Sequence, residues 1–241
     1  MGISIIVAFF EKGGLFMYPI LLVLVIGMAI ALERWVQLNR VRDANRKMWN
    51  LLYPVLAKGE FDKAQTVISN DKSTISQMLR IGLANMGVVR RREDVEIAME
   101  ESMMEIIPQL EKHTPYLALL SNVATLFGLL GTIMGLIQAF TAVSGANPAE
   151  KAALLAVSIS VAMNCTAFGL ISAIPLLLFH AKLTSMTGQI VDSLKMASVK
   201  ALSSISDFNR RYFESELEFQ EENQQVCNPG PRLETAPKIV K

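Results

Sequence analysis

The feature that most constrains this chain is a set of three long apolar stretches without a charged side chain. They are Gly13–Leu32, Thr114–Ala149 and Ala152–Phe179, and none of them contains Asp, Glu, Lys, Arg or His. A helix rises 1.5 Å per residue, so about 20 apolar residues cross the roughly 30 Å of bilayer hydrocarbon. The sequence therefore predicts an all-α integral membrane protein with three transmembrane helices and long cytoplasmic helical extensions.

Composition agrees with a membrane protein and argues against a nucleic-acid-binding protein. Hydrophobic residues make up 51% of the chain and charged residues 19%, where a soluble domain has about 25% charged residues. The formal net charge is +1, so the chain has no overall basic excess that would attract nucleic acid. The apolar composition indicates that the protein is embedded in a lipid bilayer. Cys165 lies in an apolar stretch and Cys227 in a polar tail, which makes a disulfide between them unexpected.

Basic residues near the first stretch predict the orientation in the membrane. Only Lys12 precedes this stretch, whereas five basic residues follow it closely: Arg34, Arg40, Arg42, Arg46 and Lys47. Cytoplasmic flanks of membrane helices are enriched in Lys and Arg. We therefore expect a multi-pass protein of the bacterial inner membrane, with its N-terminus in the periplasm and its C-terminus in the cytoplasm.

This orientation divides the chain into alternating membrane and aqueous segments. In chain order they are a periplasmic N-terminal segment (1–12), transmembrane helix 1 (13–32), a cytoplasmic helical domain (33–113), transmembrane helix 2 with a cytoplasmic extension (114–143), a periplasmic loop (144–151), transmembrane helix 3 (152–181), a cytoplasmic amphipathic helix (182–225) and a disordered tail (226–241).

No pattern in the chain indicates catalysis, a metal or a cofactor. The phosphate-binding G-x-x-x-x-G-K-[ST] loop and the G-x-S-x-G nucleophile turn are both absent. His113 and His180 lie at the ends of apolar stretches, without a Cys/His cluster at metal-ligand spacing. We therefore expect no enzyme, no catalytic residue, no metal site and no cofactor.

Small and hydroxyl-bearing residues recur at helical spacing in the second and third stretches. They are Ser121, Thr125, Gly128, Thr132, Gly135, Ala139 and Ala142 in the second, and Ser158, Ala162, Cys165, Gly169 and Ser172 in the third. One interpretation is close helix packing, which small residues permit in lipid. The other is a polar path for an ion, lined by the hydroxyls of Thr132, Ser158 and Thr166. The pattern alone leaves both open.

The absence of a carboxylate from all three stretches limits what this chain can do by itself. A proton-driven machine needs a titratable group within the membrane. If this protein conducts protons, a second protein must supply that group.

Three segments carry a resemblance to a known family. They are TLFGLLGTIMGLIQAF at Thr125–Phe140, ISVAMNCTAFGLISAIPL at Ile159–Leu176 and KGEFDKA at Lys58–Ala64. These segments, their order and the three-span layout resemble the MotA/TolQ/ExbB proton channel family, in particular its ExbB/TolQ-like three-span subunits.

The resemblance implies a homopentamer around a single-span ExbD/TolR-like partner that carries a membrane aspartate. It implies pore-lining roles for Thr132 and Thr166, and a TonB- or TolA-like protein as the recipient of mechanical work. The glycines of the matching motifs and the matching proline are expected to serve helix packing. These residues are Gly128, Gly131, Gly135, Gly169 and Pro175.

One departure from the family pattern affects the coupling ion. ExbB and TolQ commonly carry a glutamate where this chain has Val161. The expected ion is the proton, with sodium as the alternative.

The expected function is an ion-driven motor for TonB-type outer-membrane transport or envelope maintenance. The alternatives are a gliding or flagellar-type stator and a non-conducting membrane scaffold.

Overall fold

The computed structural model describes residues 14–84, 92–145 and 147–227, and it shows helices connected by short turns. The helices are α2 (Met17–Ala57), α3 (Phe61–Ser69), α4 (Thr74–Ala84), α5 (Arg92–Glu111), α6 (Thr114–Ser144) and α7 (Lys151–Cys227). No strand occurs among these residues. The expected all-α fold class is confirmed.

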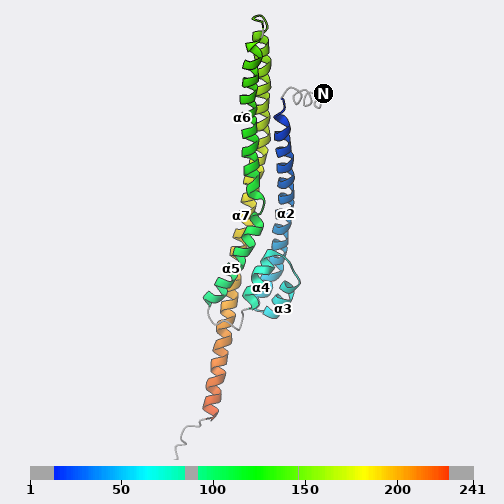
Figure 1. Cartoon of the computed structure of the whole chain (residues 1–241). Helices are drawn as coiled ribbons and strands as arrows, with labels where there is room; N and C mark the ends of the chain where they lie inside the picture. The colour runs from blue at the N-terminus through cyan, green and yellow to red at the C-terminus, as the bar shows by residue number, and fades with distance from the viewer. Residues whose placement is uncertain (1–13, 85–91, 146, 228–241) are drawn as a thin grey trace, which may run out of the picture. The chain divides into compact units, whose positions relative to one another are not determined.

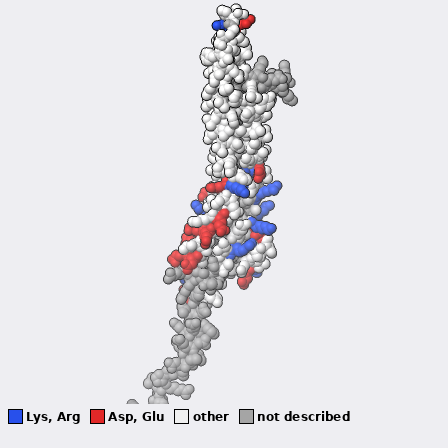
Figure 2. Space-filling view, in the orientation of Figure 1, with Lys and Arg blue, Asp and Glu red and all other residues white. Residues whose placement is uncertain are grey.

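Three helical segments are long and apolar enough to cross a membrane. They are Met17–Ala57, Glu93–Ser144 and Lys151–Tyr212. Figure 2 shows a long stretch of surface without acidic or basic side chains on the visible face. The three predicted transmembrane helices thus correspond to parts of α2, α6 and α7.

The helices extend beyond the ranges expected for the spans. α2 continues to Ala57, and α7 runs from Lys151 to Cys227 without interruption. The range expected as a tail begins inside α7, since Val226 and Cys227 are helical. The N-terminal segment 1–12 and the rest of the tail lie outside the described residues.

The chain forms two compact units. Unit 1 comprises Met1–Ala44 and Met104–Ser193, and unit 2 comprises Asn45–Met103 and Leu194–Lys241. In unit 1, α6 and the first part of α7 run side by side as a hairpin, and α2 lies along this pair (Figure 1).

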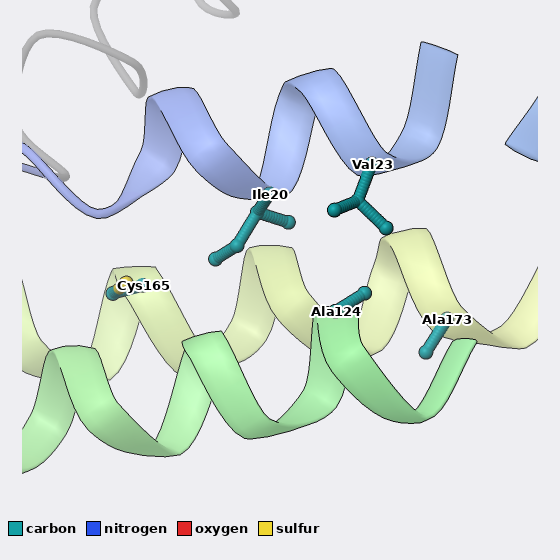
Figure 3. Packing of buried hydrophobic residues seen from close by; sticks show 5 residues of the cluster. All are labelled: Ile20, Val23, Ala124, Cys165 and Ala173. Carbon is teal, nitrogen blue, oxygen red and sulfur yellow. The ribbon is translucent and has the colours of Figure 1, made fainter. Parts of the chain in front are cut away.

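The core of unit 1 is built from small and branched side chains. Ile20 and Val23 of α2 meet Ala124 of α6 and Cys165 and Ala173 of α7 (Figure 3). Partly buried residues surround this cluster, with Phe16, Leu120, Val123, Phe127 and Phe168 packed against it. Small residues on α6 and α7 let the two backbones approach, and the aromatic rings fill the space around them.

Arg34 joins α2 to the end of α5 in unit 1. One terminal nitrogen of its buried guanidinium donates to the carbonyl oxygens of Leu110 at 2.9 Å and Gln109 at 3.4 Å. The other donates to Oε1 of Gln37 at 2.5 Å. The last carbonyls of a helix have no partner within it, and they carry the negative end of its dipole. Arg34 therefore caps α5 through both hydrogen bonding and charge.

In unit 2, α4 begins with a side-chain cap. The hydroxyl of Ser73 accepts from the backbone N–H of Ser76 at 3.3 Å, and Asp71 accepts from the N–H of Ser73 at 3.0 Å and the hydroxyl of Ser76 at 2.8 Å. Burial acts to raise the pKa of Asp71, but these hydrogen bonds outweigh it and hold the pKa below its ordinary value. The cap thus fixes the start of α4, as expected for Ser before a helix.

Candidate functional site

The helices α6 and α7 meet along a row of small residues, here called the α6–α7 seam: Gly128, Gly131, Gly135, Ala162, Cys165 and Gly169. A Cβ atom added to Gly128 would lie 3.3 Å from the Cα atoms of Gly169 and Thr166. One added to Gly169 would lie 2.9 Å from the carbonyl oxygen of Ala124. The two backbones are therefore in direct contact: a Cβ at Gly169 would collide with the backbone of α6, and one at Gly128 would require the backbone of α7 to shift by a few tenths of an ångström.

The other two seam glycines face side chains of α7. A Cβ on Gly135 would lie 2.7 Å from the Cβ of Ala162, and one on Gly131 would collide with the Sγ of Cys165. Gly131 also faces the turn just before α2, because the same added atom would lie 3.5 Å from the Cβ of Phe16. All four glycines predicted from the sequence to serve helix packing thus lie in the seam.

Two hydroxyls form hydrogen bonds across the α6–α7 pair. Thr166 Oγ1 donates to the carbonyl oxygen of Gly128 at 2.9 Å, and Ser121 Oγ donates to that of Ala173 at 2.9 Å. The Ser121 bond is buried, whereas Thr166 is only partly buried. Because hydrogen bonds are directional and contacts between apolar side chains are not, these two bonds fix how α6 and α7 are rotated relative to each other.

Thr132 and Thr125 satisfy their hydroxyls within α6. Thr132 Oγ1 donates to the carbonyl oxygen of Leu129 at 2.6 Å, and Thr125 Oγ1 to that of Ser121 at 3.1 Å. Both side chains are partly exposed in the single chain. Each hydroxyl oxygen keeps lone pairs that can accept a hydrogen bond from outside the helix.

Thr125, Thr132 and Thr166 lie on one side of the α6–α7 pair, here called the threonine face. Successive residues of a helix are rotated by about 100° about its axis. Around α6, Gly131 therefore lies about 60° to one side of Gly128, and Thr132 lies about 40° to the other side. Gly131 is on the side of Phe16 and therefore of α2. Thr132, and Thr125 with it, consequently points away from α2.

The same geometry holds on α7. Cys165 lies about 40° to one side of Gly169 and Thr166 about 60° to the other. Val161 lies further round on the Cys165 side, about 80° from Gly169, and a Cβ on Gly14, just before α2, would lie 3.4 Å from its Cγ1 atom. Thr166 is therefore directed away from α2, like Thr132.

Ser158 and Pro175 lie elsewhere. Ser158 lies about 20° from Gly169 around the axis of α7, so it is on the same face of α7 as the seam residues. Its side chain is partly buried. Pro175 lies inside α7 and has no N–H to donate, which leaves the carbonyl of Ile171 without its usual helical partner. Its neighbour Leu176 is buried, and a Cβ on Gly27 of α2 would lie 2.7 Å from it.

Sequence reasoning missed three buried hydroxyls. Thr114, Ser172 and Thr187 are buried, and their hydroxyl oxygens have no hydrogen-bond partner among the described residues. Ser172 belongs to the predicted stripe of α7, but nothing in the sequence indicates that its hydroxyl lacks a partner. No group of three or more metal-ligating side chains occurs in the part of the chain that the structure describes.

Comparison with known proteins decides the family. The profile of the MotA/TolQ/ExbB proton channel family matches residues 70–196, which include the seam and the threonine face. The chain belongs to the MotA/TolQ/ExbB proton channel family. The resemblance inferred from the sequence motifs is confirmed.

Curated members of this family align over different lengths. The Tol-Pal system protein TolQ of Haemophilus influenzae is 38% identical over 87 residues, which is 36% of this chain and 38% of TolQ. The biopolymer transport protein ExbB-like 1 of Synechocystis is 27% identical over 190 residues, or 76% of this chain and 72% of that protein. The first of these matches therefore spans well under two thirds of the relative.

A solved structure agrees with the fold. The chain resembles a chain of the C. jejuni MotAB structure with a TM-score of 0.54, covering 82% of this chain and 80% of that one at 18% identity. At this identity the similarity shows a shared fold of long helices.

Proposed function

We propose that this chain is an ExbB/TolQ-like subunit of a motor in the bacterial inner membrane that is driven by the proton-motive force. Several copies, five by analogy with the family, form a ring around a single-span partner of the ExbD/TolR type. The observation that carries this proposal is the threonine face, because Thr132 and Thr166 present hydroxyls on the side of the α6–α7 pair opposite α2.

The position of α2 supports an arrangement in which the threonine face lines the interior of the ring. In such a ring each subunit needs one side for lipid and one for the central partner. α2 occupies one side of the α6–α7 pair, so the opposite side is available for the partner helix. The partly exposed hydroxyls there can form hydrogen bonds with the partner or an ion once the partner helix excludes bulk water.

The partner supplies the acid in this proposal. The stretches Thr114–Ala149 and Ala152–Phe179 contain no Asp or Glu, and Val161 stands where ExbB and TolQ commonly have a glutamate. A membrane aspartate on the partner takes up and releases the ion next to Thr132 and Thr166. We take the ion to be the proton, with sodium as the alternative, because hydroxyl oxygens can also coordinate sodium.

The excess of Lys and Arg after the first span supports the orientation of the ring subunit, with the N-terminus in the periplasm and the C-terminus in the cytoplasm. In this orientation, rotation inside the ring transmits work to a periplasmic TonB- or TolA-like protein. That work serves outer-membrane transport or envelope maintenance.

Site-directed photo-crosslinking in cells tests the proposal. A photo-crosslinking amino acid at Thr132 or Thr166 should capture a small protein whose single span contains an aspartate. The matched control is Thr141, whose hydroxyl donates to Ile137 within α6 at 2.8 Å and which lies about 140° around α6 from Gly128, away from the threonine face. Equal capture from all three positions, or capture of copies of this chain only, would favour the scaffold alternative.

A further inference from the structure

A pocket in unit 2 lies where the turn after α2 meets α7. Its volume is about 550 Å³, within the range of about 300–1,000 Å³ that is typical of small-molecule sites. None of its lining residues belongs to unit 1, which contains the α6–α7 seam and the threonine face. The residues that decide its chemistry are three aromatic side chains, two cations and one carboxylate: Phe61, Phe208, Tyr212, Lys58, Arg211 and Asp207.

The turn between α2 and α3 forms one wall of the pocket. The N–H groups of Gly59 and Glu60 donate to carbonyl oxygens in the last turn of α2, at 3.1 and 3.2 Å. Together with the positive φ of Gly59, 75°, these bonds form the Schellman arrangement that closes a helix. The turn begins the KGEFDKA segment of the sequence, and it places Lys58 and Phe61 of that segment at the pocket.

An aromatic wall connects this turn to α7. The ring of Phe208 on α7 packs against that of Phe61, with 4.8 Å between the centroids, and it stacks with Tyr212 at 6.2 Å. Phe61 is only 8% exposed, whereas Tyr212 is 49% exposed. The aromatic wall therefore begins on a buried ring and ends on an accessible one, against which a flat ring system can stack.

The two cations at the pocket have no acidic partner. Lys58 and Arg211 are exposed, and neither forms an ion pair among the described residues. Nε of Arg211 donates to the backbone carbonyl oxygen of Asp207 at 3.2 Å, which leaves the terminal nitrogens of the guanidinium available. The side-chain carboxylate of Asp207 pairs instead with Arg210, at 3.4 Å. Lys58 and Arg211 can therefore both bind an anion.

The combination of these groups discriminates between kinds of anion. A simple phosphate would use the two cations and leave the aromatic wall uncovered. An acidic peptide would bring its carboxylates close to that of Asp207, and like charges repel each other. A nucleotide matches all three parts of the pocket, because its base can stack on the aromatic wall, its phosphates can bind Lys58 and Arg211, and its ribose hydroxyls can donate to Asp207.

We infer that this pocket binds a purine nucleoside diphosphate such as ADP. The two fused rings of a purine offer a large stacking surface, and two phosphates match two cations. The chain has no G-x-x-x-x-G-K-[ST] loop, so the inference is binding without hydrolysis. The bound nucleotide would join the turn after α2 to α7. In the orientation proposed above the pocket is in the cytoplasm, where nucleotides are abundant, but binding itself does not depend on that orientation.

Isothermal titration calorimetry of the purified full-length protein in detergent tests this site. Divalent cations are left out, so that the phosphates meet only the charges of the protein. The probes are ADP, adenosine, pyrophosphate and a triglutamate peptide. We expect ADP to bind at least tenfold more tightly than each of the other three. Equal affinity for any of the three, or no saturable binding of ADP at millimolar concentration, would overturn the nucleotide assignment.

Variants connect the binding to the pocket. Lys58→Gln and Arg211→Gln should each weaken ADP binding about tenfold, because each removes a charge-assisted hydrogen bond to phosphate. Both variants should fold normally, since these side chains are exposed and form no ion pair among the described residues. Tyr212→Leu removes a stacking surface, so it should weaken binding of ADP more than binding of pyrophosphate.

The matched control is Lys195→Gln, which removes one positive charge from an exposed position of α7 in unit 2. Lys195 does not line the pocket, and it lies about 24 Å from Arg211 along the helix. A loss of ADP affinity in Lys195→Gln equal to that in Arg211→Gln would overturn the assignment, as would full affinity in both Lys58→Gln and Arg211→Gln. None of these measurements depends on ion flux or on a partner protein, so failure of the nucleotide site leaves the proposed function standing.

Discussion

The hydroxyl of Thr166 donates to the carbonyl oxygen of Gly128 at 2.9 Å, where the backbones of α6 and α7 are in contact. The same two residues limit each other sterically, because a Cβ on Gly128 would lie 3.3 Å from the Cα of Thr166. Thr166 thus belongs both to the helix contact and to the partly exposed threonine face. This double position explains how one sequence pattern could predict either packing or an ion path, since the two features share residues.

Replacing Gly128 by a larger residue should disrupt assembly. The side chain of Gly128→Leu would meet backbone atoms of Gly169 and Thr166, which cannot rotate away. Overpacking of this kind costs about 1–3 kcal/mol or more, and separation of α6 from α7 would alter the surface available for oligomer formation. Size-exclusion chromatography of the detergent-solubilised protein should show loss of the native oligomer.

The control for this change is Gly188→Leu. Gly188 is also inside a helix, but a Cβ there meets nothing within 4 Å. This variant should keep the oligomer. An intact oligomer in Gly128→Leu would show that the α6–α7 seam is not needed for assembly.

Removal of the Arg34 side-chain charge should destabilise unit 1. Arg34→Met leaves the carbonyls of Leu110 and Gln109 without their donor at the end of α5. Loss of a charge-assisted hydrogen bond costs about 1.5–3 kcal/mol, so the thermal unfolding temperature in detergent should fall by several degrees. The exposed Arg40 on the same helix provides the control. An equal fall for Arg40→Met would indicate an effect of net charge and not of the α5 cap.

The cap of α4 should make the stability of unit 2 sensitive to acid. The pKa of Asp71 lies below its ordinary value in the folded chain, because hydrogen bonds from Ser73 and Ser76 outweigh the effect of burial. The stabilisation is therefore complete above the ordinary pKa of about 3.9 and is lost as the pH falls through the lower folded-state pKa. Asp71→Asn should lower stability at neutral pH and flatten its dependence on pH below about 4. Denaturant unfolding of the two proteins between pH 3 and 7 measures this, and parallel curves would contradict it.

The sequence was sufficient to predict the spans, because the lack of charge in Thr114–Ala149 and Ala152–Phe179 leaves few alternatives to membrane helices. It also predicted the seam glycines, since Gly128 and Gly135 recur at helical spacing among other small residues. It did not distinguish the threonine face from the seam. That distinction depends on the side of the α6–α7 pair on which α2 packs, and this is set by contacts such as that of Gly131 with Phe16.

The buried, unpartnered hydroxyls of Thr114 and Thr187 could not be predicted for a related reason. Thr114 and Thr187 are distant in the sequence, and most threonines in helices donate to their own backbone, as Thr125 and Thr184 do. Only the packed structure reveals that these two hydroxyls are buried without a partner. The unit boundaries likewise fall within α2, α5 and α7, where no change in composition marks them.

The most direct test of the account is ion flux through the native complex, purified with its partner and reconstituted into liposomes. Thr166→Val removes the hydroxyl and keeps the shape, whereas Thr166→Ser keeps the hydroxyl that reaches Gly128. We predict at least a tenfold loss of proton or sodium flux in Thr166→Val, recovery of most of the flux in Thr166→Ser, and oligomers of native size in both. Full flux in Thr166→Val with an intact oligomer would contradict a role for the threonine face in ion movement.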